Sequence, residues 1–133
     1  MGIDDDQSMN GEVGMGEAGQ ADTIFLAMLN QKKKNVELLG ISRDTMADIQ
    51  IVDEEGEYIR TTEEHLAIQY AYGDGSHFSC ELMQTAVSNL MYGLPIHGYC
   101  AINLKGIPGL NDAVGGGGLT VLGDLTDIKN ITE

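Results

Sequence analysis

The sequence predicts an α/β layered domain with a largely buried central β-sheet. Short, almost wholly apolar runs of strand length alternate with stretches in which apolar residues recur at helical period. Polar or glycine-rich turns separate these runs. The chain has 133 residues, of which 42% are hydrophobic and 21% charged, which is the size and composition of one globular domain. We therefore expect a single domain over residues 1–133.

The first part of the chain is expected to supply strands. Residues 1–3 have the character of the end of a strand, and an acidic, glycine-rich loop follows over residues 5–20. The apolar run 23–29 predicts a strand buried on both faces. A polar, lysine-rich turn at 31–35 separates it from a second apolar run at 36–41, and this arrangement indicates a β-hairpin.

The middle of the chain combines strands with a helix start signal. Strands are expected over 46–52 and 57–60, joined by a turn. Thr61 and Glu64 then have the spacing of a capping box, in which two side chains bond free N–H groups at the start of a helix. Apolar residues follow at helical period, so we expect a helix that ends at Gly73.

The remaining elements continue the alternation of helices and strands. Ser76 is expected to cap a longer helix, whose apolar stripe runs from Phe78 to Met91 and which Gly93 terminates. The last expected elements are a strand over 96–102, a short helix over 104–114 disturbed by Pro108, and a strand over 119–122.

The charge balance limits the partners of this chain. It has 21 acidic and 7 basic residues, a formal net charge of −14, and its one basic cluster is Lys32–Lys34 in the expected hairpin turn. Because a phosphate backbone requires clustered Lys and Arg, we exclude nucleic acid as a partner. No apolar run reaches the roughly 20 residues needed to cross a bilayer. An acidic protein that handles an anion must gather its few cations or recruit a metal.

The two cysteines, Cys80 and Cys100, are too few for a disulfide-rich scaffold. Cys80 falls in a helical pattern and Cys100 in a strand pattern, and neither has a CxxC partner. One bridge between them and two free buried thiols both fit this placement, and free thiols are the commoner outcome.

Residues 42–45 form the first candidate site, because they directly follow a predicted strand. Open α/β sheets bind ligands at the carboxyl ends of their strands, and Arg43 offers a planar guanidinium that matches phosphate oxygens. The alternative is an exposed ion pair between Arg43 and Asp44, which contributes little to stability.

Two carboxylates form a second candidate site, at junctions between loops and strands. Asp4 follows the first strand fragment, and Asp22 directly precedes the apolar run 23–29. If these strands are neighbours, the two side chains can share Mg²⁺ or Mn²⁺, since Mg²⁺ takes one or two carboxylates together with substrate phosphates and water. The alternative is that Asp22 only ends the acidic loop.

Residues 6–17 form a third candidate site, because their order resembles a calcium-binding loop. Oxygen-bearing side chains occur at the ligand spacing of an EF-hand, and Gly11 stands where that loop turns sharply. The candidate Ca²⁺ ligands are Asp6, Ser8, Asn10, Glu12 and Glu17. The flanking sequence argues against a true EF-hand, since a strand pattern follows the loop where a helix is required.

Several segments in order resemble the LytR-CpsA-Psr family of bacterial cell-envelope enzymes. Each motif is moderately specific, and the ordered series covers nearly the whole chain. The matching segments are Met1–Asp4 (MGID), Gly19–Ile24 (GQADTI), Ile41–Thr45 (ISRDT), Tyr70–Gly73 (YAYG), Leu94–Ile96 (LPI) and Asp112–Gly116 (DAVGG).

This resemblance implies a three-layer α/β/α domain with a central mixed β-sheet, at the extracellular face of the bacterial membrane. Family members transfer a glycopolymer, such as wall teichoic acid or capsule polysaccharide, from a polyprenyl-pyrophosphate carrier to peptidoglycan. They are normally tethered by one N-terminal transmembrane helix, and the prenyl tail lies in an apolar tunnel. They are also often labelled transcriptional regulators, a role that the acidic charge of this chain opposes.

The resemblance also implies roles for particular residues. Asp4 and Asp22 correspond to the metal-side carboxylates, for Mg²⁺ or Mn²⁺. Arg43 corresponds to a catalytic arginine that binds the pyrophosphate, and Asp44 would orient it. Arginines and a metal together offset the charge of a pyrophosphate, as phosphoryl transfer requires.

The chain departs from the family pattern at several points. Gln20 stands where the family usually has arginine, and His65 stands where a lysine is common, although both positions belong to the expected pyrophosphate site. The loop over residues 5–20 is enlarged and acidic. The later arginine motifs of the family are absent, so we expect residues 1–133 to match the N-terminal portion of the family domain.

Three interpretations of function follow from these observations. The first is a polymer-transferring enzyme of this family, inactive as the present segment if the later arginines are required. The second is a non-catalytic module that binds a polyprenyl phosphate or a divalent cation. The third is an unrelated acidic structural or regulatory protein.

Overall fold

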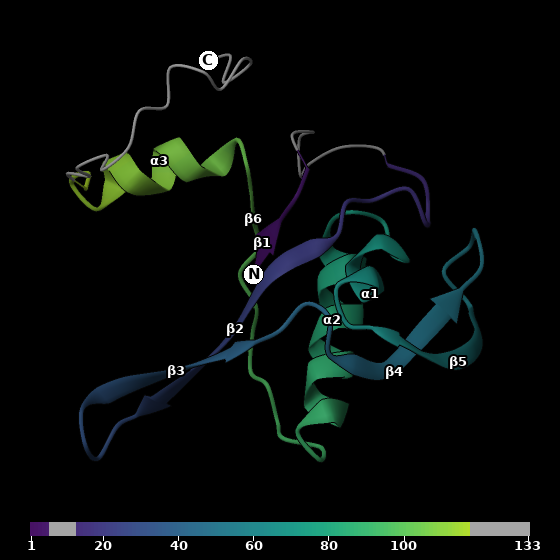
Figure 1. Cartoon of the computed structure of the whole chain (residues 1–133), viewed down its shortest axis with the longest axis horizontal. Helices are drawn as coiled ribbons and strands as arrows, with labels where there is room; N and C mark the ends of the chain where they lie inside the picture. Colours follow the sequence, from purple (N-terminus) through teal and green to yellow (C-terminus); the bar gives the residue numbers. More distant parts are fainter. Residues whose placement is uncertain (6–12, 118–133) are drawn as a thin grey trace.

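The computed structural model describes residues 1–5 and 13–117 (Figure 1). The elements in chain order are β1 (Gly2–Ile3), β2 (Ala21–Asn30), β3 (Asn35–Ile41), β4 (Met46–Val52), β5 (Tyr58–His65), α1 (Ile68–Ala71), α2 (His77–Leu90), β6 (Ile102–Asn103) and α3 (Gly106–Ala113). Strands β3, β2, β1 and β6 form one sheet in this order, and strands β4 and β5 form a separate antiparallel pair. Strand β1 runs antiparallel to β2 and parallel to β6, so the sheet is mixed.

The core lies where α1 and α2 pack against the strands, and this packing confirms the α/β fold. Helix α2 contacts β4, and α1 contacts β2, β4 and β5. Burial of one large apolar side chain stabilises a fold by about 1.5–3 kcal/mol. The largest apolar contributors to this core are Ile24, Ile49, Leu66, Tyr70 and Met83.

Helix α3 lies outside this core: it contacts β6 and has no buried residue. No described helix is long and apolar enough to span a membrane.

Strands β2 and β3 form the predicted hairpin, with seven residue pairs from Ile24–Ile41 to Asn30–Asn35. The prediction that residues 23–29 are buried on both faces is wrong, because Phe25 and Leu29 are exposed. The physical reason is that β3 packs against β2 alone among the described elements. The hairpin therefore projects from the rest of the molecule (Figure 1).

The predicted capping box at Thr61 and Glu64 is wrong. Both residues lie in β5, where Thr61 pairs with Gln50 of β4 and Glu64 pairs with Ala47. The helix that follows, α1, has four residues and no side-chain capping bond. Pairing with β4 satisfies the backbone groups that the capping box would otherwise serve, so tertiary structure overrides the local pattern.

Helix α2 begins at the predicted position, but a different side chain caps it. Ser76 precedes the helix without forming a capping hydrogen bond. Instead the Asp74 carboxylate accepts hydrogen bonds from the backbone N–H groups of Ser76, at 2.8 Å, and Ser79, at 3.1 Å. A carboxylate at a helix N-terminus also interacts favourably with the helix dipole. Gly93, at a φ of 80°, follows the end of α2 as predicted.

The strand predicted over 96–102 is wrong except at its end. Only Ile102–Asn103 form a strand, and the preceding residues run along α2 through side-chain bonds. The short helix predicted over 104–114 is confirmed by α3, which accommodates Pro108 in its first turn, where a missing N–H has no cost. The strand predicted over 119–122 lies outside the described residues.

Candidate functional site

A β-bulge in β2 sets the position of Asp22. Gly2 of β1 pairs with Thr23 and Ile3 pairs with Ala21, so Asp22 has no partner residue on β1. A bulge of this kind redirects the side chain of the extra residue. The Asp22 carboxylate accepts a short hydrogen bond from the Arg43 guanidinium.

Arg43 lies just after the carboxyl end of β3 and is held from several sides. Its guanidinium donates to the Asp22 carboxylate and to Gln20 Oε1 at 2.9 Å, and its Nε lies 3.8 Å from Asp44 Oδ1. Its carbonyl accepts the N–H of Ala67 at 3.1 Å, which ties residues 42–45 to the core. The pair with Asp44, considered from sequence as the alternative to a ligand site, is thus the longest of these contacts.

His65, the last residue of β5, completes this group through Asp44. Its Nδ1 lies 3.3 Å from the Asp44 carbonyl oxygen and 3.7 Å from Asp44 Oδ1. The fold thus brings together five residues that the sequence singled out over a span of about 45 positions. We call Gln20, Asp22, Arg43, Asp44 and His65 the Arg43 cluster.

Asp4 lies next to this cluster without an ion pair to Arg43. Strands β1 and β2 are neighbours, as the metal hypothesis required, and Asp4 Oδ1 accepts the backbone N–H of Gln20 at 2.6 Å. Among the described residues there is no group of three or more His, Cys, Asp or Glu side chains able to hold a metal. Asp4 and Asp22 offer the hard oxygen donors that Mg²⁺ prefers, and a substrate phosphate would have to complete the shell.

Most of the candidate Ca²⁺ ligands lie outside the residues that the structure describes. Asp6, Ser8, Asn10 and Glu12 lie outside the described part of the chain. Glu17 is exposed, and its backbone N–H donates to the Gly14 carbonyl at 3.1 Å. The loop therefore remains a sequence prediction.

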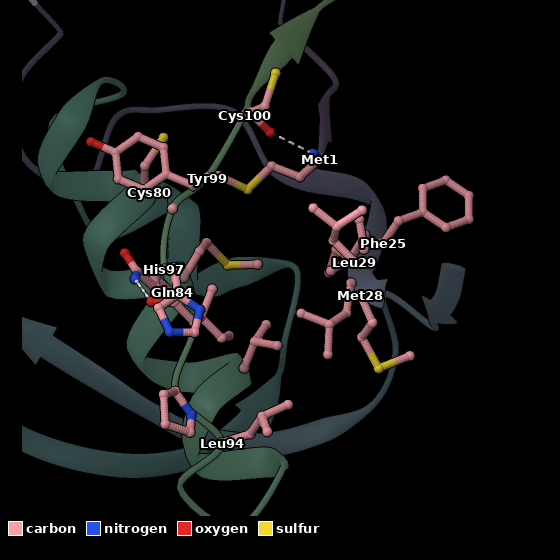
Figure 2. A pocket seen from close by; sticks show the side chains of 18 of the residues that line it. Met1, Phe25, Met28, Leu29, Cys80, Gln84, Leu94, His97, Tyr99 and Cys100 are labelled. Atoms are coloured by element: carbon pink, nitrogen blue, oxygen red, sulfur yellow. Dashed lines mark hydrogen bonds between the residues drawn. The ribbon is translucent and has the colours of Figure 1, made fainter. Parts of the chain in front are cut away.

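A large apolar groove, not predicted from the residues alone, begins on the same strand as Asp22. It has a volume of about 1080 Å³ and lies between residues 24–29 of β2, helix α2 and the segment 94–100 (Figure 2). Beyond the bulge, Ile24 and Leu26 alternate along β2 and so point to one face of it, which borders the groove. The apolar runs of β2 and α2 indicate two walls of such a groove in the sequence, but the segment 94–100 has no pattern that predicts a third wall.

Hydrogen bonds hold the segment 94–100 in place as the outer wall of this groove. Ser88 Oγ donates to the Leu94 carbonyl at 2.9 Å, and Gln84 Nε2 donates to the Ile96 carbonyl. At the other end, the amino group of Met1 donates to the Cys100 carbonyl at 2.7 Å. The wall is therefore attached to α2 and to β1, the strand that carries Asp4 at its end (Figure 2).

The two cysteines differ in environment, and no bridge joins them. Cys80 is buried in the groove wall, whereas Cys100 is exposed. Burial, with the negative charge of Asp74 as the next cause, raises the pKa of the Cys80 thiol from 9.0 to about 11.

We expect iodoacetamide at about pH 8 to label one thiol per native chain, at Cys100, and both thiols after denaturation. The raised pKa keeps Cys80 protonated, and only the thiolate reacts. Because the folded-state pKa is raised, the neutral thiol favours folding fully below pH 9.0, and this contribution is lost as pH rises from 9.0 to about 11. Mass spectrometry of the labelled chain, with Cys100→Ser as control, checks the prediction; fast labelling of that variant would contradict it.

Comparisons with known proteins agree with the resemblance. The model of the LytR_cpsA_psr family matches residues 1–130. The polyisoprenyl-teichoic acid–peptidoglycan teichoic acid transferase TagU of Enterococcus faecalis is 33% identical over 116 residues, which are 87% of this chain and 32% of that protein. The TagU of Halalkalibacterium halodurans is 29% identical over 99 residues, 74% of this chain and 28% of that protein.

These matches cover most of this chain but only part of each relative. The chain spans about a third of the length of the curated relatives it matches. No solved structure matches it significantly. Since the family model covers nearly all of the sequence, the chain belongs to the LytR_cpsA_psr family.

Proposed function

We propose that this chain is the carrier-binding part of a cell-envelope glycopolymer transferase, acting at the extracellular face of the membrane. Its donor would be a polyprenyl-pyrophosphate-linked glycopolymer such as a teichoic acid, and its acceptor peptidoglycan. The observation that carries this proposal is that Asp22, which bonds Arg43, lies at the start of β2, the strand that also borders the apolar groove. One ligand with an anionic head and a long apolar tail would occupy both features.

The head of the carrier would lie at Arg43. The guanidinium already faces several acceptors, and a bound phosphate would exchange with the neutral Gln20 amide more easily than with the Asp22 carboxylate. Asp44 would act as a positioning residue, since it contacts both Arg43 and His65. The arrangement therefore offers one guanidinium and one imidazole to the pyrophosphate.

The tail of the carrier would lie in the groove. Its volume of about 1080 Å³ reaches the upper end of the range for ligand pockets, about 300–1,000 Å³. Its wall includes Ile24, Leu26, Met83 and Val87. Each buried methylene of a prenyl chain would contribute about 0.8 kcal/mol to binding.

The charge around Arg43 favours a bound divalent cation as part of the site. Two carboxylates, Asp22 and Asp44, already approach this single guanidinium, and Asp4 lies at the end of the neighbouring strand. A pyrophosphate placed there would meet net negative charge. Mg²⁺ or Mn²⁺ would be held by Asp4 and Asp22, and it would supply charge stabilisation for the phosphate oxygens.

In the proposed reaction, a peptidoglycan hydroxyl attacks the phosphorus that bears the polymer. The bond from that phosphorus to the bridging oxygen breaks, the polymer phosphate joins the acceptor, and the prenyl phosphate leaves with the bridging oxygen. Arg43 would stabilise the negative charge that develops on this leaving group. The attacking hydroxyl loses its proton to water or to a nearby base.

We expect the groove and the Arg43 cluster to contribute separately to binding. Leu26→Asn, on the groove side of β2, should weaken binding of farnesyl pyrophosphate at least about fivefold and leave binding of inorganic pyrophosphate unchanged. The loss corresponds to about 1 kcal/mol, below the usual value of one buried leucine contact. Leu38→Asn, on the opposite side of the hairpin, is the matched control and should change neither affinity.

Calorimetric titration at fixed Mg²⁺ measures both ligands. Equal affinities of Leu26→Asn and the unchanged chain for farnesyl pyrophosphate would place the tail outside the groove and defeat the proposal.

The second candidate function is a non-catalytic module that binds a polyprenyl phosphate or a divalent cation. The same neutralisation of Arg43 by Asp22 and Asp44 favours it, because one compensated guanidinium is a weak cation set for turnover. Binding of the carrier without transfer of polymer to purified peptidoglycan would select this function over the first.

A further inference from the structure

The outer face of the β2–β3 hairpin is an apolar surface that no described element covers. Residues opposite each other in an antiparallel ladder lie on the same face of the sheet. The register places six residues without charge on this outer face, in the pairs Phe25–Gly40, Ala27–Leu38 and Leu29–Val36. All six are exposed, Phe25 by 58% and both Leu29 and Leu38 by 68%.

This outer face begins at the rim of the groove, which Phe25, Ala27 and Leu29 also border. The Phe25 ring points away from Cys80 and Tyr99 across the groove (Figure 2), and it lies over Gly40, where an added Cβ would be 3.5 Å from the ring. A contiguous apolar surface of this kind on a folded domain marks an interaction site. The outer face is therefore the side of the hairpin that continues beyond the rim of the groove, away from Cys80 and Tyr99.

The tip of the hairpin carries the one basic cluster of this acidic chain. The Asn30 side chain accepts the backbone N–H groups of Lys32 and Lys33, at 3.1 and 3.0 Å, which orders the turn. Lys32–Lys34 are exposed and form no ion pair within the described residues. The acidic turn at 53–57 lies on the opposite side of the molecule (Figure 1).

We infer that this hairpin lies flat on an anionic phospholipid bilayer, with the outer face at the acyl boundary and the lysines among the headgroups. Apolar side chains enter this boundary by about 5–10 Å, and each nearby lysine adds attraction to an anionic leaflet. A second copy of the chain fits this surface less well, because it brings the same lysines, whereas an anionic leaflet complements them. The inference does not depend on the proposed transfer reaction.

Vesicle binding by the 133-residue chain tests the inference. The chain has no tryptophan, so Phe25→Trp adds a single fluorescent reporter on the outer face. With vesicles of about 70% phosphatidylcholine and about 30% phosphatidylglycerol, we expect the emission of this variant to shift to shorter wavelength. Pure phosphatidylcholine vesicles should bind at least about tenfold more weakly.

Matched variants distinguish the contribution of the hairpin to vesicle binding from a general effect of charge or hydrophobicity. Lys32→Gln/Lys33→Gln should weaken binding to the anionic vesicles at least about tenfold, whereas Arg60→Gln/Lys105→Gln, which removes the same charge elsewhere, should change it less than about twofold. Leu38→Glu on the outer face should abolish binding. Leu110→Glu, at a comparably exposed leucine of α3, should leave it intact.

Arg43→Ala should bind vesicles as the unchanged chain does, so a failure of the proposed function is distinguishable from a failure of this inference. The inference would be overturned if both variants of each matched pair lost vesicle binding equally, or if the unchanged chain bound neither kind of vesicle. If the emission of the Phe25→Trp variant is already at shorter wavelength without vesicles, another part of the chain covers the outer face, and this result would also overturn the inference. A dimer that Leu38→Glu dissolves, with no vesicle binding, would assign the outer face to self-association.

Discussion

Replacement of Arg43 by alanine is expected to weaken binding of a polyprenyl pyrophosphate at least about tenfold. The substitution removes the central cation of the cluster and leaves Asp22 and Asp44 facing the anion without compensation. A charge-assisted hydrogen bond contributes about 1.5–3 kcal/mol, which corresponds to about tenfold or more in affinity. Calorimetry with farnesyl pyrophosphate measures the change.

Two controls sharpen this experiment. Arg60→Ala removes the other arginine, which is exposed on β5, and should leave the affinity unchanged. Repeating each titration with EDTA in place of Mg²⁺ should abolish binding if Asp4 and Asp22 hold the metal. Unchanged affinity in Arg43→Ala would remove this residue from the site, whatever the metal dependence.

Gly73→Ala is expected to destabilise the fold by about 3 kcal/mol, near the upper end of the cost of overpacking. An added Cβ would lie 2.6 Å from Ser79 Cα and 2.7 Å from Ser79 N, so the first turn of α2 would have to move. That turn is also fixed by Tyr70, whose hydroxyl donates to the Gly75 carbonyl at 2.8 Å. The backbone between α1 and α2 therefore has no space for a side chain at position 73.

Urea unfolding followed by circular dichroism measures this effect. Gly98→Ala is the matched control, since an added Cβ there meets nothing within 4 Å and the backbone is not in the left-handed region. We expect Gly98→Ala to change the free energy of unfolding by less than about 0.5 kcal/mol. Equal unfolding midpoints for the two variants would contradict the steric argument.

The candidate site was largely predictable from the sequence, because its residues occur at the ends of recognisable strands. Arg43 follows β3, and Asp22 is the second residue of β2. Their mutual contact was not predictable. Asp22 reaches Arg43 because a bulge removes it from the pairing of β1 with β2, and a bulge depends on both strands. As a result, a residue expected on the metal side also positions the arginine.

The sequence alone determines those elements that have a local pattern of apolar residues. The strands at 36–41 and 46–52 and the long helix α2 follow from apolar periodicity, which is a property of consecutive residues. Long-range packing, in contrast, pairs Thr61–His65 with β4, leaves one face of β2 exposed, and makes residues 94–100 close a groove. These features depend on which segments meet across the chain, because burial and backbone pairing then outweigh a local preference.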